Sequence, residues 1–442
     1  MWLILRLVII GANLNNMNIL EKLENKKIGF IGYGIENQAL LAWLKKHNVK
    51  ATYTFCDSRS EIEDKNLNVS WRLGENYLKD LNDFDIIFRS PGCPLFLPEV
   101  QAVKEKISSA MNLFMEACPT KNIIGVTGSK GKGTTSSLIY SILHEAKKSV
   151  FLGGNIGVAP FTFIDEVQED SYVVLELSSF QLEDFKISPR YSILTNLFQE
   201  HLEPADPNNP NYHKTFEDYK AAKLNIAKFS ENEVFLTHSR LRGLASNDKA
   251  KYFDTCDYPS KLAGEFNKEN IAAAVMLTEI LGIDTEVIKR AVASFNGLPH
   301  RLEKIAEING VTYFDNSFST TPESTIADIK SFPGAIMLMG GADKGADFKE
   351  LAKEVALNVK FVVLFKGDAT PRLKMDLIHA NLHANKITIA GSMEEAVKKA
   401  ATRAKELEAT TVLLSTACAS FGLFKNYKER GDLFQQYVKG LE

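Results

Sequence analysis

One segment combines glycines, lysines and hydroxyl side chains in an order that could bind nucleotide phosphates. It reads GVTGSKGKGTT, at residues 125–135, between a short apolar run and a helix-forming run. Glycines let the backbone N–H groups point inward, and the start of the helix adds positive potential. Lys132 stands where it could reach the β- and γ-phosphates. We therefore predict an ATP phosphate loop here, with a glycine-rich turn that binds nothing as the alternative.

The spacing of this loop departs from the usual pattern. From Gly125 to Gly131 there is one residue more than in the common motif, and Gly133 stands where a serine or threonine normally follows the lysine. A hydroxyl that faces Mg²⁺ must therefore come from Thr134 or Thr135.

Further along the chain, an acid, a histidine and a lysine could complete a metal site. Glu176 ends an apolar run, and a carboxylate there is costly unless it meets a cation. His201 follows the next apolar run, but histidine is an unusual neighbour for Mg²⁺, so a surface histidine is the alternative. Lys223 lies in YKAAKLNIAKF, whose simplest interpretation is a solvated helix face.

A first glycine turn precedes these features. Gly32 and Gly34 match the first two glycines of GxGxxG, whereas Asn37 replaces the third. Asp57 ends the next strand-like run, where a carboxylate could bind a ribose. The SPG turn at residues 90–92 should lie at the same sheet edge. The two turns together predict a site for a nucleoside diphosphate, and the alternative is a βα turn without a ligand.

The elements that must position these residues alternate between short β-rich runs and helical stretches from residue 26 onward. This alternation predicts an α/β protein with mostly parallel sheets. We expect a Rossmann-like first domain at residues 1–110, a P-loop ATPase domain at 111–297 and a Rossmann-like third domain at 298–442. A chain of 442 residues also exceeds what one core usually organises.

Composition excludes several classes of function. The chain carries 52 basic and 55 acidic residues, a formal net charge of −3, and no basic stretch, so we expect no nucleic-acid partner. Five scattered cysteines without a CxxC pair indicate reduced thiols in a cytoplasmic protein. The apolar start MWLILRLVII is too short to span a bilayer. We interpret it as an over-extended start before Met17, with a signal segment as the alternative, and expect no stable membrane insertion.

Over about residues 26–440 the chain resembles the Mur ligase family. The resemblance rests on motifs that occur in this order: GVTGSKGKGTT (125–135), GGNIG (153–157), ELSSFQLE (176–183), EHLE (200–203), AAKLNI (221–226), GLPHRLE (297–303), GGADKGADF (340–348) and ACASFGLFKNYKERG (417–431). The third and the last of these are similar to the branch of the family that adds D-glutamate.

The resemblance implies an ATP-dependent acid–amino-acid ligase of peptidoglycan precursor synthesis. ATP, with two Mg²⁺ ions, would phosphorylate the carboxylate of UDP-N-acetylmuramoyl-L-alanine, and the amine of D-glutamate would attack the acyl phosphate. A monomer is expected. The alternatives are a ligase that adds another amino acid, a folylpolyglutamate ligase, and a nucleotide-binding homologue without catalytic activity.

The resemblance also implies roles for individual residues. Those expected in catalysis are Lys132, Glu176, His201 and Lys223. Those expected to bind metal are Thr134, Glu176, His201 and Lys223, the last as a carbamate, which turns an ammonium into an anion. Those expected to contact ATP are Gly128, Ser129, Lys130, Gly131, Lys132, Gly133, Thr134, Thr135, Asn267, Asn270, Arg301 and Asn316.

The remaining implied residues contact the other two substrates. The first domain would hold the uridine diphosphate through Ile35, Glu36, Asp57, Ser58, Arg59, Ser90 and Gly92. Substrate contacts are also expected from Asn155, Ser178 and Gln181. D-glutamate would be surrounded by Thr320, Lys344, Ser420, Phe421 and Tyr427.

Four departures from the family pattern bear on the details of the site. EHLE replaces the usual DH-hydrophobic-D, and residues 204–215 form a longer stretch than usual before AAKL. Phe266 replaces a histidine, and Phe318 replaces a lysine. We expect these changes to alter the amino-acid pocket more than the reaction.

Overall fold

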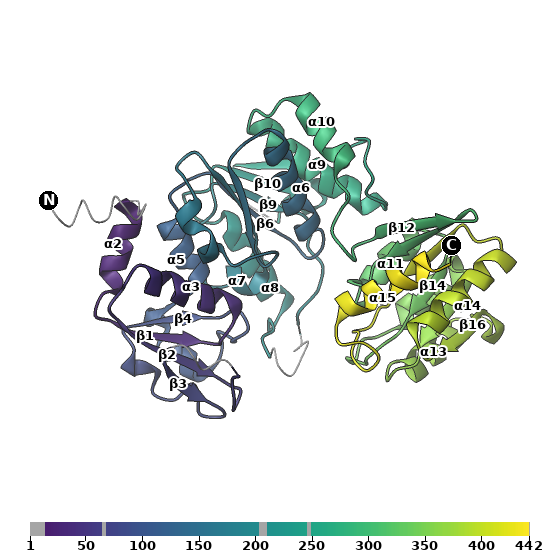
Figure 1. The fold of residues 1–442 in the computed structure, drawn as a ribbon, viewed down its shortest axis with the longest axis horizontal. Helices are drawn as coiled ribbons and strands as arrows, with labels where there is room; N and C mark the ends of the chain where they lie inside the picture. Colours follow the sequence, from purple (N-terminus) through teal and green to yellow (C-terminus); the bar gives the residue numbers. More distant parts are fainter. Residues whose placement is uncertain (1–13, 64–67, 203–209, 245–248, 442) are drawn as a thin grey trace. The chain divides into compact units, whose positions relative to one another are not determined.

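The computed structural model describes residues 14–63, 68–202, 210–244 and 249–441 (Figure 1). The apolar start, within residues 1–13, and the first half of the long stretch before AAKL, residues 204–209, lie outside these ranges. The chain divides into two compact units. The first comprises Met1–Tyr258 with Glu269–Val292, and the second comprises Pro259–Lys268 with Ala293–Glu442.

The first unit begins with a parallel sheet in the order β3-β2-β1-β4-β5. Its strands are β1 (Lys27–Ile31), β2 (Thr52–Asp57), β3 (Ser70–Leu73), β4 (Ile86–Arg89) and β5 (Ile107–Ser108). Its helices are α2 (Leu14–Leu23), α3 (Ile35–Lys46), α4 (Pro98–Gln101) and α5 (Ala110–Ala117). Because β2 and β4 flank β1 on opposite sides, the strand order reverses there, and a crevice at the carboxyl end of β1 is the usual ligand site of such sheets.

A second parallel sheet follows in the order β11-β10-β9-β6-β8-β7. Its strands are β6 (Ile123–Thr127), β7 (Val150–Gly154), β8 (Tyr172–Glu176), β9 (Tyr191–Leu194), β10 (Val234–His238) and β11 (Ala250–Phe253). Its helices are α6 (Lys132–Glu145), α7 (Ser179–Leu182), α8 (Phe216–Leu224), α9 (Glu265–Ile280) and α10 (Thr285–Ser294), the last two of which cross the boundary between the units. The fully buried β6 lies centrally and delivers the phosphate loop at its carboxyl end.

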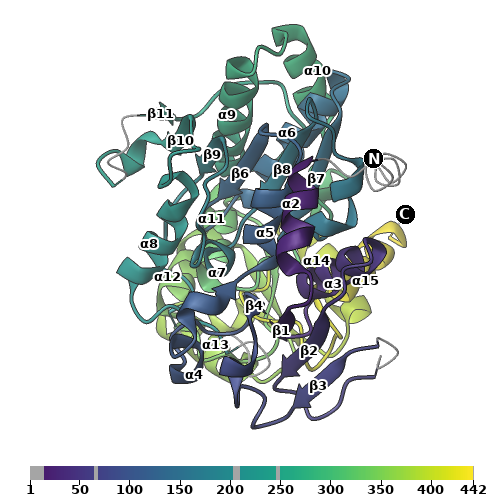
Figure 2. The ribbon, with the colours of Figure 1, turned by 90° about the vertical axis from the view of Figure 1, so that its left-hand side faces the viewer.

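One continuous core joins the first two sheets. It contains Phe30 and Phe55 of the first sheet, Phe114 of α5, and Val173 and Phe235 of the second sheet. Helices α2, α3 and α5 pack against one another at this core (Figure 2). Such a shared core makes the two sheets one mechanical body.

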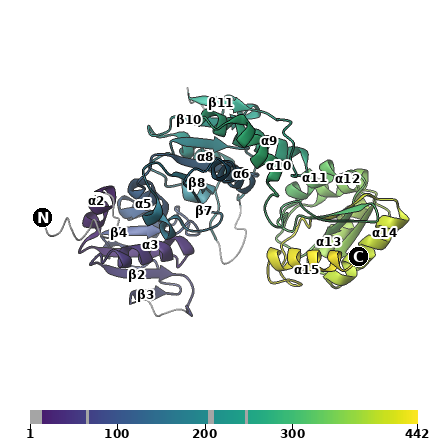
Figure 3. The same cartoon turned by 45° about the horizontal axis from the view of Figure 1, so that its top comes forward.

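The second unit holds a sheet in the order β12-β13-β17-β14-β15-β16. Its strands are β12 (Glu303–Ile308), β13 (Val311–Asp315), β14 (Ile336–Met339), β15 (Phe361–Phe365), β16 (Ile387–Ala390) and β17 (Thr411–Leu414). Its helices are α11 (Pro322–Ser331), α12 (Lys349–Asn358), α13 (Thr370–His379), α14 (Met393–Glu406) and α15 (Tyr427–Lys439). One core packs α11, α12 and α13 on one face, and another packs α14 and α15 on the other (Figure 3).

The α/β class with mostly parallel sheets is confirmed, and the strands predicted from apolar runs are present. Two differences have physical causes. The edge strand β12 is antiparallel to β13, and each of its residues is exposed or partly buried, so it lacks a buried apolar run. Strand β3 is also an edge strand without a fully buried residue, and it gave no signal in the sequence.

Candidate active site

The phosphate loop closes around its own lysine. Lys132 Nζ donates to the carbonyl oxygens of Gly128, at 2.8 Å, and of Ser129, at 3.0 Å. Gly128 and Gly131 have φ angles of 149° and 82°, in a region that favours glycine. A Cβ at Gly128 would overlap Thr195 Oγ1. The loop therefore depends on glycine for both conformation and space.

Side chains after β9, which the sequence gave no reason to select, hold the loop from outside. Thr195 Oγ1 donates to the carbonyl oxygen of Lys130 at 2.6 Å, and the Lys130 backbone N–H donates to Asn196 Oδ1 at 2.8 Å. Ser129 Oγ lies 2.7 Å from the Tyr219 hydroxyl. The only sign of these residues in the sequence is that Thr195 and Asn196 directly follow the apolar strand β9, which pairs with β6. These bonds fix the path of the loop before any ligand arrives.

Lys223 lies beneath the loop, not on a solvated helix face. It is 2% exposed, and its Nζ donates to the Gly128 carbonyl oxygen at 2.8 Å. Burial lowers the pKa of Lys223 well below its ordinary value, and the neighbouring charge of Lys132 acts in the same direction, against Glu200 and Glu176. An amine of low pKa is the form that reacts with carbon dioxide, so this environment suits a carbamate.

Glu176 ends β8 in register with Val126 of β6. The residue is 2% exposed, and Asn155 Nδ2 donates to its Oε1 at 2.8 Å. Its Oε2 is buried and has no hydrogen-bond partner among the described residues. A buried carboxylate oxygen without a partner is costly, and a bound cation would satisfy it.

His201 also lies at this edge, in a left-handed conformation with φ of 59°. The residue is exposed, yet its ring lies edge-on to Phe180, with ring centres 5.2 Å apart. Desolvation by the surrounding protein lowers the pKa of His201 to about 4, and the charges of Lys132 and Lys223 contribute against Glu200. A neutral imidazole is the form that binds a metal.

Glu200 belongs to the same edge, because its carboxylate lies 2.5 Å from Lys130 Nζ. Thr134 and Thr135, at the start of α6, are both buried. Thr135 Oγ1 donates to Asn270 Oδ1 at 3.4 Å, which brings Asn270 to the phosphate loop. The second sheet therefore gathers most of the residues expected for catalysis and phosphate binding.

The two turns of the first sheet do meet at its carboxyl edge. The Ser90 backbone N–H donates to the Ile31 carbonyl oxygen, and a Cβ at Gly32 would lie 2.8 Å from Ser90 Cβ. Asp57 accepts from the Tyr33 backbone N–H at 2.7 Å and from Arg59 Nε at 2.8 Å. Burial opposes ionisation, but the Arg59 hydrogen bond and two backbone N–H groups hold the pKa of Asp57 below its usual value.

Other residues expected here differ in their surroundings. Ile35 is exposed at 64%, Ser58 is exposed, and Gly92 is half-buried. Glu36 is buried and accepts a short hydrogen bond from Gln181 of α7. Burial raises the pKa of Glu36 to about 7, the bond from Gln181 lowers it, and the charge of Asp184 adds to the rise. Ser178 caps α7 by accepting from the Gln181 backbone N–H.

Arg89 joins the two sheets, and the sequence analysis missed it. The guanidinium is almost fully buried and donates to Cys93 O at 2.6 Å, to Phe180 O at 3.0 Å and to Asp184 Oδ2 at 3.1 Å. The signal that could have found it is a charged residue at the end of the apolar strand IIFR. Arg89 fixes the turn at residues 90–92 relative to the segment after Glu176.

The other expected residues lie in the second unit: Asn267, Arg301, Asn316, Thr320, Lys344, Ser420, Phe421 and Tyr427. Phe318, which replaces the family's lysine, lies under the Arg301 guanidinium at 3.7 Å and edge-on to Tyr427. Lys344 Nζ lies 5.8 Å from the centre of the Phe421 ring. Asn316 Nδ2 donates to Asp328 at 2.6 Å, and Asn267 Nδ2 donates to Ala263 O at 2.6 Å.

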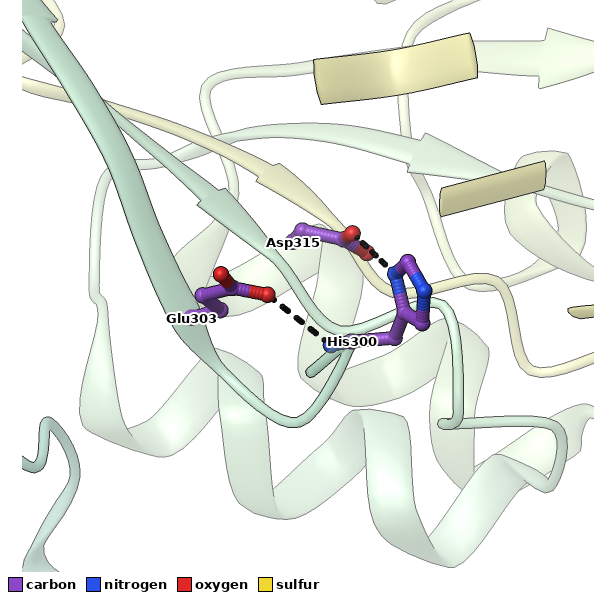
Figure 4. A group of neighbouring side chains, drawn as sticks. All are labelled: His300, Glu303 and Asp315. Atoms are coloured by element: carbon purple, nitrogen blue, oxygen red, sulfur yellow. Dashed lines mark hydrogen bonds and ion pairs between the residues drawn. The ribbon is translucent and has the colours of Figure 1, made fainter. Parts of the chain in front are cut away.

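A cluster of His300, Glu303 and Asp315 stands at the start of the third sheet (Figure 4). His300 Nδ1 lies 2.7 Å from Asp315 Oδ2, and Glu303 accepts from the His300 backbone N–H at 3.0 Å. Gln435 donates to both carboxylates. These bonds tie β12, β13 and α15 together. The role of the cluster is structural.

Comparison with known families assigns the class of protein. The chain matches the model of the Mur ligase middle domain at residues 126–251 and that of the Mur ligase glutamate ligase domain at residues 300–418. The chain therefore belongs to the Mur ligase family.

Among its relatives, the UDP-N-acetylmuramoylalanine–D-glutamate ligase of Acetivibrio thermocellus is 33% identical over 96% of this chain and 98% of that protein. The protein of the same name from Clostridium kluyveri is 35% identical over 94% of this chain and 97% of its own length.

Solved structures of this fold agree. The MurF ligase of Thermotoga maritima in complex with ADP covers 96% of this chain and 97% of its own, at a TM-score of 0.57 and 18% identity. The UDP-N-acetylmuramate-alanine ligase MurC from the same organism covers 95% of this chain and 100% of its own, at a TM-score of 0.56 and 18% identity. No helix in the described part of this chain combines the length and apolar composition that crossing a membrane requires.

Proposed function

We propose that this chain joins D-glutamate to UDP-N-acetylmuramoyl-L-alanine with consumption of ATP. Relatives that bear this activity in their names are 33% and 35% identical over nearly the whole chain. The observation that carries the chemistry is the unpartnered, buried Glu176 Oε2 on the strand next to the phosphate loop. A cation bound there would pair with this oxygen.

The residues present fit magnesium. Mg²⁺ prefers oxygen ligands and keeps few protein contacts. Glu176, the Thr134 hydroxyl and, after carbamylation, Lys223 would supply such oxygens, and His201 would stand at a second ion. When bound, two Mg²⁺ ions would offset the charge that gathers between ATP and the substrate carboxylate.

ATP binding is assigned to the phosphate loop, residues 128–135, with Asn270 beside it. The backbone N–H groups of the loop and the start of α6 offer a positive site for phosphates. In the described structure Lys132 Nζ is held by two loop carbonyls. It would exchange these bonds for phosphate oxygens. Asn267, Arg301 and Asn316 are the other residues that we expect to contact ATP.

The other two substrates are assigned to separate parts of the chain. The crevice of the first sheet, with Asp57, Arg59, Ser90 and Glu36, would hold the uridine diphosphate. The set of Thr320, Lys344, Ser420, Phe421 and Tyr427 would hold D-glutamate. We further propose three domains at about residues 1–110, 111–297 and 298–442, and a cytoplasmic monomer.

The work of the protein is then mostly positioning. Lys132 would orient the phosphate that is transferred, and His201 and Asn155 would border the acceptor carboxylate. The deprotonated amine of D-glutamate would attack the acyl carbon, the C–N bond would form and the C–O bond to inorganic phosphate would break. The protons that the nitrogen gives up would pass to phosphate and water, so no protein acid–base pair is assigned. Exclusion of water matters because water would hydrolyse the acyl phosphate.

One assay series tests the proposal. Purified protein is combined with ATP, Mg²⁺, UDP-N-acetylmuramoyl-L-alanine and either D- or L-glutamate, and released phosphate is measured. We expect release with D-glutamate and none above background with L-glutamate. Release with L-glutamate alone would overturn the stereochemical assignment, and no release with any glutamate would favour an inactive nucleotide-binding homologue.

A further inference from the structure

The segment at residues 210–214 runs between the first and the second sheet. It forms neither helix nor strand, yet Asn211 and His213 are each only 2% exposed. Connecting segments usually lie on the surface, because a buried loop must satisfy its polar groups. Specific contacts on both sides of the segment bury these two side chains.

On one side the segment contacts the turn at residues 90–92 of the first sheet. We call this the diphosphate turn, because the sequence predicts that it forms part of a nucleoside diphosphate site. Asn211 Nδ2 donates to the Pro91 carbonyl oxygen at 2.6 Å. Tyr212 lies edge-on to Phe96, with ring centres 5.1 Å apart. Lys214 Nζ lies 4.8 Å from the centre of the same Phe96 ring. These contacts span residues 91–96, the chain that directly follows Ser90.

On the other side the segment binds the edge of the second sheet. The His213 backbone N–H donates to the His201 carbonyl oxygen at 2.8 Å. The His213 ring stacks on Phe180, with centres 4.8 Å apart and planes at 6°, and its Nε2 lies 3.0 Å from Ser179 Oγ. Both partners lie in α7, which follows Glu176.

The contact with His201 bears on a strained residue. His201 has φ of 59°, which a residue with a Cβ adopts at a cost in free energy. The hydrogen bond from His213 holds the carbonyl oxygen of that residue, so it favours the left-handed conformation. The direction of the His201 side chain thus depends on the segment.

We propose that residues 211–213 are a strap that couples occupancy of the diphosphate turn to the orientation of His201. This inference rests on the proposed function, because it takes the turn as the site of the uridine diphosphate. Asn211 and His213 are positioning residues: neither touches the reacting atoms, but Asn211 holds the turn that would bind the diphosphate, and the His213 backbone holds His201. Arg89 also connects the chain after Ser90 to α7, because its guanidinium donates to the carbonyl oxygens of Cys93 and Phe180.

A substitution at Asn211 can distinguish a positioning role from a role in packing alone. Its Oδ1 is buried and has no hydrogen-bond partner within the described ranges. Leucine has a similar size, and it would remove both the bond to Pro91 and the unpartnered oxygen. Loss of one hydrogen bond and removal of one unpartnered atom oppose each other in stability. Asn211→Leu should therefore change positioning more than folding.

The test compares Asn211→Leu with Asn358→Leu. Asn358 is a half-buried asparagine of the second unit whose side chain makes one hydrogen bond, to Glu354. Calorimetry without ATP or Mg²⁺ gives the Kd for UDP-N-acetylmuramoyl-L-alanine, and steady-state kinetics gives KM for each substrate. For Asn211→Leu we expect the Kd and KM of the UDP substrate to rise about tenfold, as for a lost hydrogen bond, with KM for ATP and the melting temperature near wild type. Asn358→Leu should leave all of them unchanged.

A second variant addresses the other side of the strap. His213→Phe keeps the stack on Phe180 and the backbone bond to His201, but it removes the Ser179 contact that helps to fix the position of that backbone. We therefore expect kcat to fall, with a smaller change in the Kd of the UDP substrate. If both variants bind UDP-N-acetylmuramoyl-L-alanine with the wild-type Kd, the proposed coupling by residues 211–213 is wrong. Wild-type protein that does not bind the UDP substrate would instead overturn the proposed function.

Discussion

At the scale of single residues, the site is built from charged groups that are buried before any ligand binds. Lys223 is 2% exposed beneath the phosphate loop, and Glu176 is equally buried with one oxygen unpartnered. Buried charges are costly unless they are paired or neutralised. Buried ionisable groups of this kind gather at functional sites, so we expect Lys223 and Glu176 to take part in binding and catalysis, where a cation would pair with the carboxylate.

Replacement of Lys223 tests its expected conversion to a carbamate. Burial keeps the amine neutral at lower pH than usual, and the neutral amine is the reactive form. We expect wild-type activity to rise with bicarbonate, and Lys223→Ala to lose about 100-fold or more in kcat at every bicarbonate concentration. Lys228→Ala, at an exposed lysine nearby, is the matched control. Unchanged activity of Lys223→Ala at low and high bicarbonate would contradict a functional carbamate on Lys223.

The pKa of His300 predicts how stability changes with pH. The hydrogen bond to Asp315 raises the pKa of His300 above 6.5, against desolvation. The protonated ring therefore stabilises the folded state fully below about pH 6.5, and this contribution is lost as pH rises through the raised pKa. Urea unfolding at about pH 6 and about pH 8.5 measures the difference.

His300→Gln serves as the comparison in that experiment, because glutamine has no charge to lose. We expect its free energy of unfolding to fall less between the two pH values than that of the wild type. An equal fall in both proteins would contradict the assignment to His300.

At the scale of elements, close approach of backbone to side chains fixes where helices can lie. Gly431, in the second turn of α15, is buried against His300 and Asp315. A Cβ there would overlap His300 Nδ1 and lie 2.7 Å from Asp315 Oδ2. The helix can therefore contact β13 and the His300 cluster only because this position has no side chain.

Gly431→Ala should separate α15 from that cluster. We expect the free energy of unfolding to fall by about 1–3 kcal/mol, as for other overpacked sites, measured by urea denaturation. Gly440→Ala is the control at the end of the same helix, where φ is −82° and a Cβ would meet nothing closer than 3.6 Å. Alanine there should be neutral or stabilising by up to about 1 kcal/mol. Equal effects of the two substitutions would show that the cluster does not limit the approach.

At the scale of the whole molecule, the chain has separate cores in its two compact units. One core joins the first two sheets, and the helices on each face of the third sheet have their own. Units with separate cores can unfold separately, so a single two-state transition is not expected.

Nucleotide should act on one of these transitions. With Mg²⁺ and a non-hydrolysable ATP analogue at about 100 times its Kd, the unit that holds the phosphate loop should gain about 2.7 kcal/mol. Hydrogen exchange of peptides from β6 and from β14 can monitor urea unfolding. We expect the analogue to shift the urea midpoint of the β6 peptide more than that of the β14 peptide. Equal shifts in both peptides would mean that the units unfold together.

The sequence by itself determined the α/β class, most of the strands and the membership of the Mur ligase family, and it predicted a phosphate loop at residues 125–135. These features depend on local order: apolar runs with helices between them, and glycines next to Lys132. The sequence also marked Glu176, since a carboxylate at the end of an apolar strand is visible without coordinates.

Only the tertiary structure decided what surrounds those residues. It buried Lys223 beneath the loop, where its sequence context favoured a solvated helix face, and it brought Thr195 to the loop from a neighbouring strand. It also placed Arg89 and Asn211 between two sheets. Burial and contacts between distant segments depend on how strands pair and helices pack, and neither is encoded in the order of neighbouring residues.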